Sequence, residues 1–172
     1  ELPQVFRAWL DKAESKYKNE AIQGELAHTY VYVYEHNKAF VKPRIKRIIK
    51  SSNYAKKRVF RILQYKEYDL DDDYYESLIL ASKDSESEVI DDILLLMNSK
   101  DIFSPDLGKA MIGWKNKGLN LQNLRWVIGE LSKTNDEVVK YFFLNVQELN
   151  SFPVVDDLFV PMIRNNLPET IL

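Results

Sequence analysis

The chain has 172 residues, a hydrophobic fraction of 45% and a formal net charge of −2 at pH 7. Its length is enough for one domain with a substantial core, and the absence of Cys excludes disulfides, thiolate zinc sites and a cysteine nucleophile. Five Gly and six Pro are too few for the dense turns of a β-sandwich or barrel, so the composition favours helices. No apolar run approaches the roughly 20 residues that span a bilayer, and we therefore expect no membrane insertion.

Two helices are predicted within residues 1–40. Apolar side chains recur at three- and four-residue spacing from Leu2 to Ala13, and the first helix is expected to end near Lys18. The second is expected from Glu20 to His36, although residues 30–34 alternate between Tyr and Val in the manner of a strand.

Residues 41–66 predict a short helix followed by a longer one. Pro43 suits the first turn of a helix and is expected to open the short one, whereas Asn53 is expected to cap the longer one. The apolar residues with core spacing in these two helices are Ile45, Ile48, Ile49, Val59, Phe60 and Leu63.

The acidic run 71–73 places negative charge at the start of the next helix, where carboxylates complement the helix macrodipole. Ser85 and Glu88 fit a capping box, in which each side chain accepts a hydrogen bond from a free backbone donor of the first turn. This box predicts a helix over residues 86–99.

Further start signals follow at regular distances. Ser104 and Pro105 combine a cap with a first-turn proline, and Gly118 is expected to close the helix that they start. Apolar spacing predicts the next helix over residues 121–132.

A second capping box consists of Thr134 and Glu137 and predicts a helix over residues 138–149. Pro153 is expected to start a final helix. Trp9, Trp114 and Trp126 lie on or beside the apolar stripes and are expected in the core, with contact to a partner as the alternative.

The span 73–106 resembles one unit of the pentatricopeptide repeat, a helix pair of about 35 residues. The matching residues are Tyr75, Leu78, Ile79, Met97, Pro105 and Asp106. The resemblance implies that the chain is a right-handed α-solenoid that binds single-stranded RNA on its concave surface, one nucleotide per repeat, usually in mitochondria or chloroplasts. Glu76 occupies the position where the family usually reads a base with Asn, Ser or Thr, whereas Asp106 matches the second reading position.

The expected fold class is therefore all-α, as a stack of antiparallel helix pairs within one domain over residues 1–172. Residues 1–40 form an N-terminal helix pair, 41–135 the repeat-like pairs and 136–172 the C-terminal helices.

A Cys-free chain suits a reducing intracellular compartment. The resemblance implies the mitochondrial matrix, and otherwise we expect the cytoplasm or nucleus. Because the chain starts at Glu1 rather than Met, we expect a processed or excised piece.

Charge is strongly segregated along the chain. Residues 41–66 contain ten Lys or Arg and no Asp or Glu. Cations neutralise phosphates, so this basic block is a candidate nucleic-acid site. Tyr54, Phe60 and Tyr65 lie among the cations, and a ring can stack on a base where it is exposed; Phe60 is expected in the core. The candidate residues are Lys42, Arg44, Lys46, Arg47, Lys50, Lys56, Lys57, Arg58 and Arg61, with Lys66 completing the block.

Residues 67–106 contain thirteen Asp or Glu against only Lys83 and Lys100. This acidic block is a candidate surface for a basic protein partner, and its candidate residues are Asp71, Asp72, Asp73, Glu76, Glu88, Asp91 and Asp92. In the alternative interpretation, the basic and acidic helices pack side by side and neutralise each other.

Signals for catalysis are weak, and we expect a non-catalytic protein. His28 and His36 are the only histidines, and no third metal ligand lies near them in the sequence. The chain has no phosphate-binding Gly loop, nucleophile elbow or Ser-His-Asp set. We therefore expect no metal, cofactor or small-molecule substrate. Two hypotheses about function remain: an RNA-binding module of organellar RNA processing or translation, and a protein-interaction scaffold.

Overall fold

The computed structural model describes residues 2–16, 19–65 and 67–145, and these residues form helices and turns without a strand. The elements are α1 (Gln4–Lys16), α2 (Glu20–Tyr32), the 3₁₀ helix η1 (Tyr34–His36), α3 (Lys38–Ile48), α4 (Asn53–Leu63), α5 (Asp72–Ala81), α6 (Ser87–Ser99), α7 (Pro105–Asn116), α8 (Leu124–Thr134) and α9 (Asp136–Leu144). The predicted all-α class is confirmed. None of the described helices is long and apolar enough to cross a membrane.

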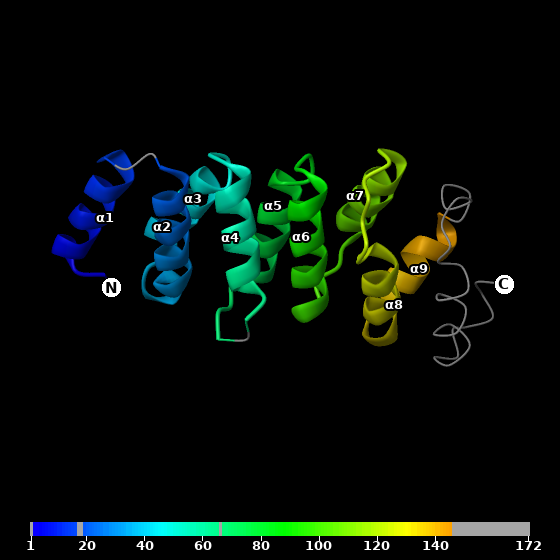
Figure 1. The fold of residues 1–172 in the computed structure, drawn as a ribbon. Helices are drawn as coiled ribbons and strands as arrows, with labels where there is room; N and C mark the ends of the chain where they lie inside the picture. The colour runs from blue at the N-terminus through cyan, green and yellow to red at the C-terminus, as the bar shows by residue number, and fades with distance from the viewer. Residues whose placement is uncertain (1, 17–18, 66, 146–172) are drawn as a thin grey trace.

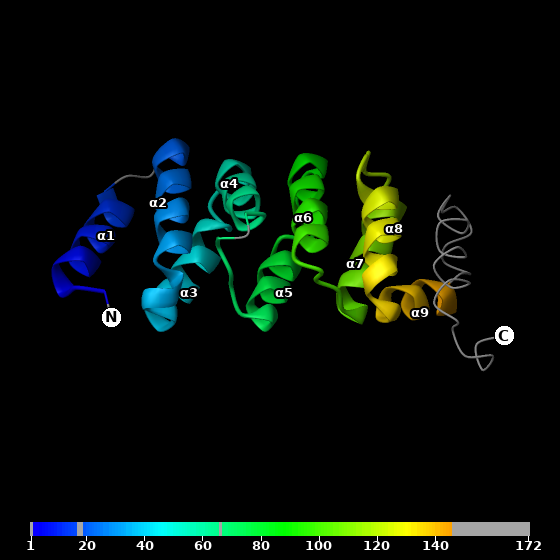
Figure 2. The same ribbon diagram turned by 90° about the horizontal axis from the view of Figure 1, so that it is seen from below.

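The helices after α1 lie in two rows. Helices α2, α4, α6 and α8 pack against one another in the even row, and α3, α5, α7 and α9 follow one another in the odd row (Figures 1 and 2). The odd-row helices begin at residues 38, 72, 105 and 136, so successive starts lie 34, 33 and 31 residues apart. The odd-row helices therefore begin at a nearly regular spacing in the low to mid-thirties within the described chain.

Local hydrogen bonds start these helices, but not always at the expected residue. The Asn37 side chain accepts a hydrogen bond from the Phe40 N–H, so α3 begins before Pro43, which lies inside the helix and not at its start. Ser52, rather than Asn53, caps α4 by accepting from the Ala55 N–H at 3.1 Å. Both predicted start positions were wrong, because Asn37 and Ser52, which come earlier in the chain, accept hydrogen bonds from the free backbone N–H groups of the first turn.

Both predicted capping boxes are also wrong. The N-cap of α6 is Glu86, without a side-chain cap, and the Ser85 hydroxyl has no hydrogen-bond partner among the described residues. At α9 the cap is Asn135, because the Thr134 hydroxyl donates instead to Asp101 at 3.0 Å. The Thr134 side chain, which the local pattern predicted as a cap, instead makes a tertiary hydrogen bond to Asp101.

Two other signals are confirmed. Ser104 caps α7, with Pro105 in the first turn, and Gly118 follows the end of the same helix with a φ of +71°. Glycine adopts this left-handed conformation without the steric cost of a Cβ atom. Proline in the first turn and glycine just past the end therefore define α7.

Other boundaries differ moderately from expectation. The strand-like residues 30–34 belong to the end of α2 and to η1, and α8 begins at Leu124 rather than residue 121. Residues 138–144 are helical as expected, whereas residues 146–149 and the helix expected from Pro153 lie outside the described residues.

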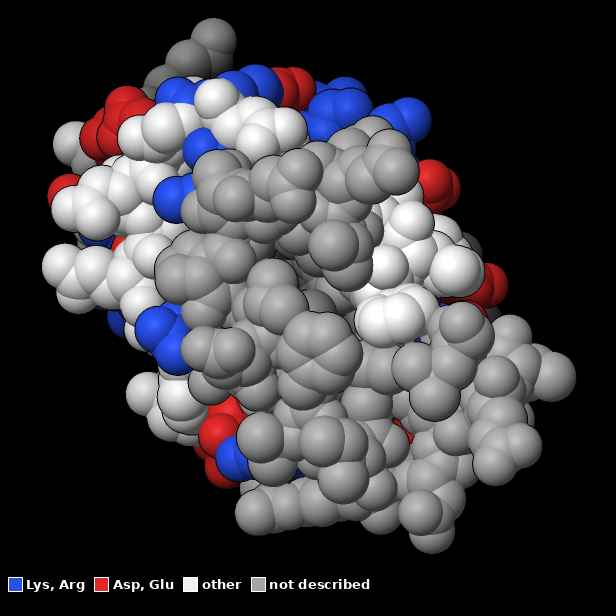
Figure 3. Space-filling model, turned by 90° about the vertical axis from the view of Figure 1, so that its right-hand side faces the viewer, with Lys and Arg blue, Asp and Glu red and all other residues white. Residues whose placement is uncertain are grey.

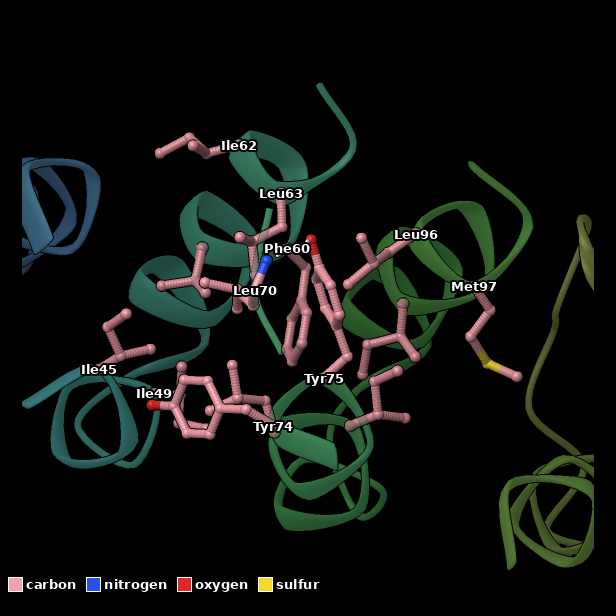
Figure 4. Packing of buried hydrophobic residues seen from close by; sticks show 14 of the residues in the cluster. Ile45, Ile49, Phe60, Ile62, Leu63, Leu70, Tyr74, Tyr75, Leu96 and Met97 are labelled. Carbon is pink, nitrogen blue, oxygen red and sulfur yellow. Dashed lines mark hydrogen bonds between the residues drawn. The ribbon is translucent and has the colours of Figure 1, made fainter. Parts of the chain in front are cut away.

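The core runs between the two rows. Around α5, Figure 4 shows Phe60 and Leu63 of α4 converging with Tyr75 of α5 and Leu96 of α6. All four are buried, and the Tyr75 hydroxyl accepts a hydrogen bond from the Leu70 N–H at 3.2 Å. The even-row helices thus pack on their row neighbours, and α2, α4 and α8 also contact helices of the odd row.

The three tryptophans differ in burial, against the prediction that all of them lie in the core. Trp114 is buried as predicted, and its Nε1–H donates to the Lys83 carbonyl at 2.7 Å. Trp9 and Trp126, however, are 54% and 49% exposed, so the prediction of a core position is wrong for both. Their apolar faces are accessible on the surface.

Asp101, two residues past the end of α6, has a φ of +52°, the left-handed conformation that Asn, Asp and Gly tolerate best. We expect Asp101→Val to lower the free energy of unfolding by about 1 to 2 kcal/mol, because a branched side chain clashes in this conformation. Asp101→Asn is the control, since it keeps an acceptor for Thr134, and its urea midpoint should match that of the wild type. Equal midpoints for the Val and Asn variants would contradict this prediction.

Candidate nucleic-acid interface

The basic residues of α3 divide into paired and unpaired cations. Arg44 pairs with Asp11 of α1, and the Arg47 Nε lies 2.8 Å from a Glu14 carboxylate oxygen, so both guanidinium groups tie α3 to α1. Lys46 and Lys50 are exposed and have no carboxylate partner within the described ranges. Lys46 on α3 and Lys50, two residues past its end, are therefore open to a ligand without the loss of an ion pair.

Lys42 belongs to a cluster around Asp71. The Asp71 carboxylate accepts hydrogen bonds from Lys38 at 2.7 Å, Lys42 at 2.6 Å and the Tyr34 hydroxyl at 3.0 Å. These donors, the lysines first, hold the pKa of Asp71 well below its usual range. Tyr34 and Tyr74 stack beside them with their ring centroids 5.7 Å apart. Asp71, a predicted partner-binding residue, and Lys42, a predicted nucleic-acid ligand, are therefore engaged with each other.

Helix α4 presents a continuous polar and aromatic face. Tyr54, Lys57, Arg58, Arg61 and Tyr65 follow one another at helical spacing, with Tyr65 two residues past the end of the helix. We call these five residues the α4 stripe. The two rings are 47% and 62% exposed, whereas Phe60 is fully buried as predicted, on the opposite side of the helix.

Each cation of the α4 stripe pairs with a carboxylate of a neighbouring even-row helix. Lys57 pairs with Glu88 of α6, and Arg58 lies 3.1 Å from Glu25 of α2. The Glu88 and Glu25 side chains are 73% and 64% exposed, so water and salt reach both pairs. Lys56 points elsewhere and donates to Asn53 at 3.3 Å. Lys66 lies outside the described residues.

The third pair of the stripe is different because its carboxylate is buried. Asp92 is 6% exposed, and both of its oxygens accept from the Arg61 Nε at 3.0 Å. Burial raises the pKa of Asp92, and the positive charge of Arg61 opposes this rise. The buried carboxylate orients the guanidinium, whose outer amino groups remain at the surface, since the Arg61 side chain is 59% exposed.

A groove of about 610 Å³ lies beside the stripe. It crosses α6 from Tyr65 and Arg61 on the α4 side to Trp126 of α8. The complete lining is Arg61, Gln64, Tyr65, Asp92, Leu95, Asn98, Ser99 and Trp126. A smaller hollow of about 220 Å³ is lined by Tyr54, Lys57, Arg58 and Arg61. Arg61 lines both hollows.

The predicted acidic surface is divided between internal contacts and solvent. Besides Glu88 and Asp92, Asp91 accepts from the Asn123 side chain at 3.3 Å, and Glu76 accepts from the Ser104 hydroxyl at 2.5 Å. Asp72 and Asp73 at the start of α5 are exposed and have no cation partner among the described residues. At the α9 end of the molecule, the described Lys, Arg, Asp and Glu side chains are likewise interspersed (Figure 3). Of the seven predicted acidic residues, Asp72 and Asp73 are therefore the two that remain exposed without a partner in the described chain.

A separate pocket of about 420 Å³ opens in the odd row between α5 and α7. Its lining includes Leu80, Lys83, Asp106, Lys109 and Gly113. Asp106, the second base-reading position implied by the repeat resemblance, lies at this pocket, whereas Glu76 is not part of the lining.

Metal ligation finds no support in the described part of the chain. No group of three or more His, Asp or Glu side chains is placed to hold an ion there. His28 instead packs edge-on against Tyr68, with ring centroids 6.1 Å apart.

Sequence reasoning identified the cations and both rings of the α4 stripe but missed Trp126. Its apolar spacing suggested a core position, and no signal in the sequence distinguishes a half-exposed Trp from a buried one. Comparison with known proteins adds no assignment: no protein-family model, curated protein or solved structure matches this chain.

Proposed function

We propose that this chain is a non-catalytic helical-repeat module that binds single-stranded RNA. In this proposal its helix pairs stack as a right-handed α-solenoid of the pentatricopeptide type. The repeat resemblance further supports a role in organellar RNA processing or translation, in the mitochondrial matrix. It does not support the surface proposed below, because its reading positions Glu76 and Asp106 lie on the odd-row helices α5 and α7.

The α4 stripe is the observation that carries the proposal. Proteins that bind single strands combine cations that follow the phosphates with exposed rings on which bases stack. In the stripe, Tyr54 and Tyr65 flank Lys57, Arg58 and Arg61, and these residues line two hollows in the surface. Paired bases hide their faces from such rings, so the stripe suits an unpaired strand.

The existing ion pairs do not prevent binding. Exposed pairs contribute only about 0 to 1 kcal/mol each, so Lys57 and Arg58 can exchange Glu88 and Glu25 for phosphate at little cost. Phosphate contacts also release counterions from the nucleic acid, which favours binding at low salt. Net acidity is therefore compatible with local binding of a polyanion.

Replacing Lys57 and Arg58 with Ala is expected to weaken RNA binding and to reduce its salt dependence. Each phosphate contact on a single strand contributes about 0.7 to the slope of log affinity against log salt, so the slope should fall by about 1.4. Fluorescence anisotropy with an unstructured RNA across a salt series measures both quantities.

The matched control is Lys109→Ala with Lys140→Ala, which removes two exposed cations of the odd row. Its slope should stay at the wild-type value. Absence of RNA binding by the wild type at about 50 mM salt, where phosphate contacts are strong, would contradict the proposed function. An unchanged slope in the Lys57 and Arg58 variant would show that the strand lies elsewhere.

A second candidate function is a scaffold that binds a basic protein. It is favoured by Asp72 and Asp73, which stay exposed without a cation partner in the described chain, and by exposed Asp106 at the start of the next odd-row helix. A lysine-rich peptide should bind the wild type and lose affinity when these three residues are changed to Asn. Equal affinities would count against this surface.

A further inference from the structure

We infer that the groove across α6 receives an unpaired nucleobase, which stacks on Trp126 of α8 and Tyr65 of α4 while Arg61 binds the adjoining phosphate. This inference rests on the proposed function and extends the RNA path from one helix to three. It assigns to Trp126 a binding role that the basic block does not include.

The two rings line the same groove from different helices. Tyr65 is 62% exposed and Trp126 is 49% exposed, whereas Phe60, Tyr75 and Trp114 of the even- and odd-row helices are buried in the core. Neither the Tyr65 hydroxyl nor the Trp126 Nε1–H has a hydrogen-bond partner in the described ranges. Both rings therefore offer an apolar face together with a free polar group, which suits a base that has a flat face and a polar edge.

Arg61 supplies a fixed donor at the edge of this groove. Its Nε is used by buried Asp92, and the four N–H groups of its outer amino nitrogens have no acceptor among the described residues. The planar guanidinium matches the geometry of phosphate oxygens and binds them in bidentate fashion. Asp92 thus acts as a positioning residue that holds Arg61 toward the ligand.

The dimensions and lining of the groove also fit a base. Its volume of about 610 Å³ lies within the range of about 300 to 1,000 Å³ common to small-molecule sites. Leu95 gives the groove an apolar contact, and the Asn98 side chain adds a donor and an acceptor. Lys57 and Arg58 continue a cationic path from Arg61, so the charge favours a polyanion over an acidic side chain alone.

Tryptophan fluorescence provides the test, because the three tryptophans have distinct environments. An unstructured RNA of about ten nucleotides should quench the wild type, and the quenching should persist in Trp9→Phe, since Trp9 lies on α1, which precedes the even row at the end opposite α8 (Figure 1). It should disappear in Trp126→Phe, because the remaining Trp114 is buried and Trp9 is distant.

Affinity gives an independent readout. Trp126→Ala should weaken RNA binding roughly 5- to 150-fold, the range that stacking of one base implies, whereas Trp126→Phe should keep most of the affinity because a ring remains. A duplex of the same sequence should neither bind this tightly nor quench. Circular dichroism and urea midpoints equal to those of the wild type would show that both variants are folded.

The outcomes separate the two proposals. If RNA binds the wild type but Trp126→Ala binds equally well, or if quenching survives in Trp126→Phe, the groove is not the base site and only this inference fails. If duplex quenches as strongly as single strand, the stacking role fails as well. If no RNA binds at about 50 mM salt, the proposed function itself fails and this inference fails with it.

Discussion

Replacing Phe60 with Ala is expected to lower the free energy of unfolding by about 3 to 5 kcal/mol, the range for removing a large aromatic side chain from a core. Phe60 is fully buried between the two rows, where Figure 4 places it beside Leu63 and Tyr75. The loss combines the hydrophobic transfer energy of the ring with the cost of the cavity that remains. Urea denaturation followed by circular dichroism measures the effect.

Tyr54→Ala is the matched control, because it removes a ring of similar size from the same helix. Tyr54 is 47% exposed, so its loss should cost only about 1 kcal/mol, clearly less than the loss of Phe60. The same variant should weaken RNA binding while leaving the fold intact. Similar stability losses for the two variants would contradict the division of α4 into a core face and a binding face.

Arg61→Ala is expected to lower stability by about 2 kcal/mol at neutral pH, because it leaves the Asp92 carboxylate buried without its counterion. A fully buried pair would lose about 3 to 5 kcal/mol, but the Arg61 side chain is 59% exposed and water replaces part of its effect. Urea midpoints of the variant and the wild type between about pH 4 and pH 7, a range above the ordinary pKa of Asp, measure the difference.

The pH dependence follows from the direction of the pKa shift. Burial raises the pKa of folded Asp92, so its contribution to stability is greatest when it is protonated and falls as the pH rises from the unfolded pKa through the folded pKa. Removing Arg61 raises that pKa further. The stability difference between Arg61→Ala and the wild type should therefore be largest near pH 7 and shrink toward pH 4.

Asp92→Asn provides the control for this prediction. Once the carboxylate is absent, Arg61→Ala no longer leaves a buried charge, so adding it to Asp92→Asn should cost much less than in the wild type. A full loss in both backgrounds would mean that Arg61 stabilises the protein through packing of its side chain and not through Asp92.

Much of the fold was predictable because its signals are local. Helical spacing of apolar residues gave the all-α class, and Pro105 and Gly118 marked both ends of α7. The predicted helix caps were wrong where a side chain could form more than one hydrogen bond. Thr134 could cap α9 or donate to Asp101, and the second contact exists only once α6 and α8 are packed together.

The candidate site was predictable to a similar extent. The sequence identified Tyr65 among the cations of the basic block, and the same helical spacing indicated that Phe60 would be buried. It did not reveal Trp126 as the opposite wall of a groove, because that wall belongs to a helix about 60 residues away. A groove between helices is a product of their packing.

By itself, the sequence determined the helical class and which residues share a face of each helix, because the 3.6-residue period is a property of the backbone. The tertiary structure alone decided where the opposite charges meet. Arg44, Arg58 and Arg61 find carboxylates 31 or 33 residues away in neighbouring helix pairs, and Asp71 gathers two lysines in the same way. Because Coulomb attraction and hydrogen bonding act over a few ångströms, these pairings depend on which helices lie side by side.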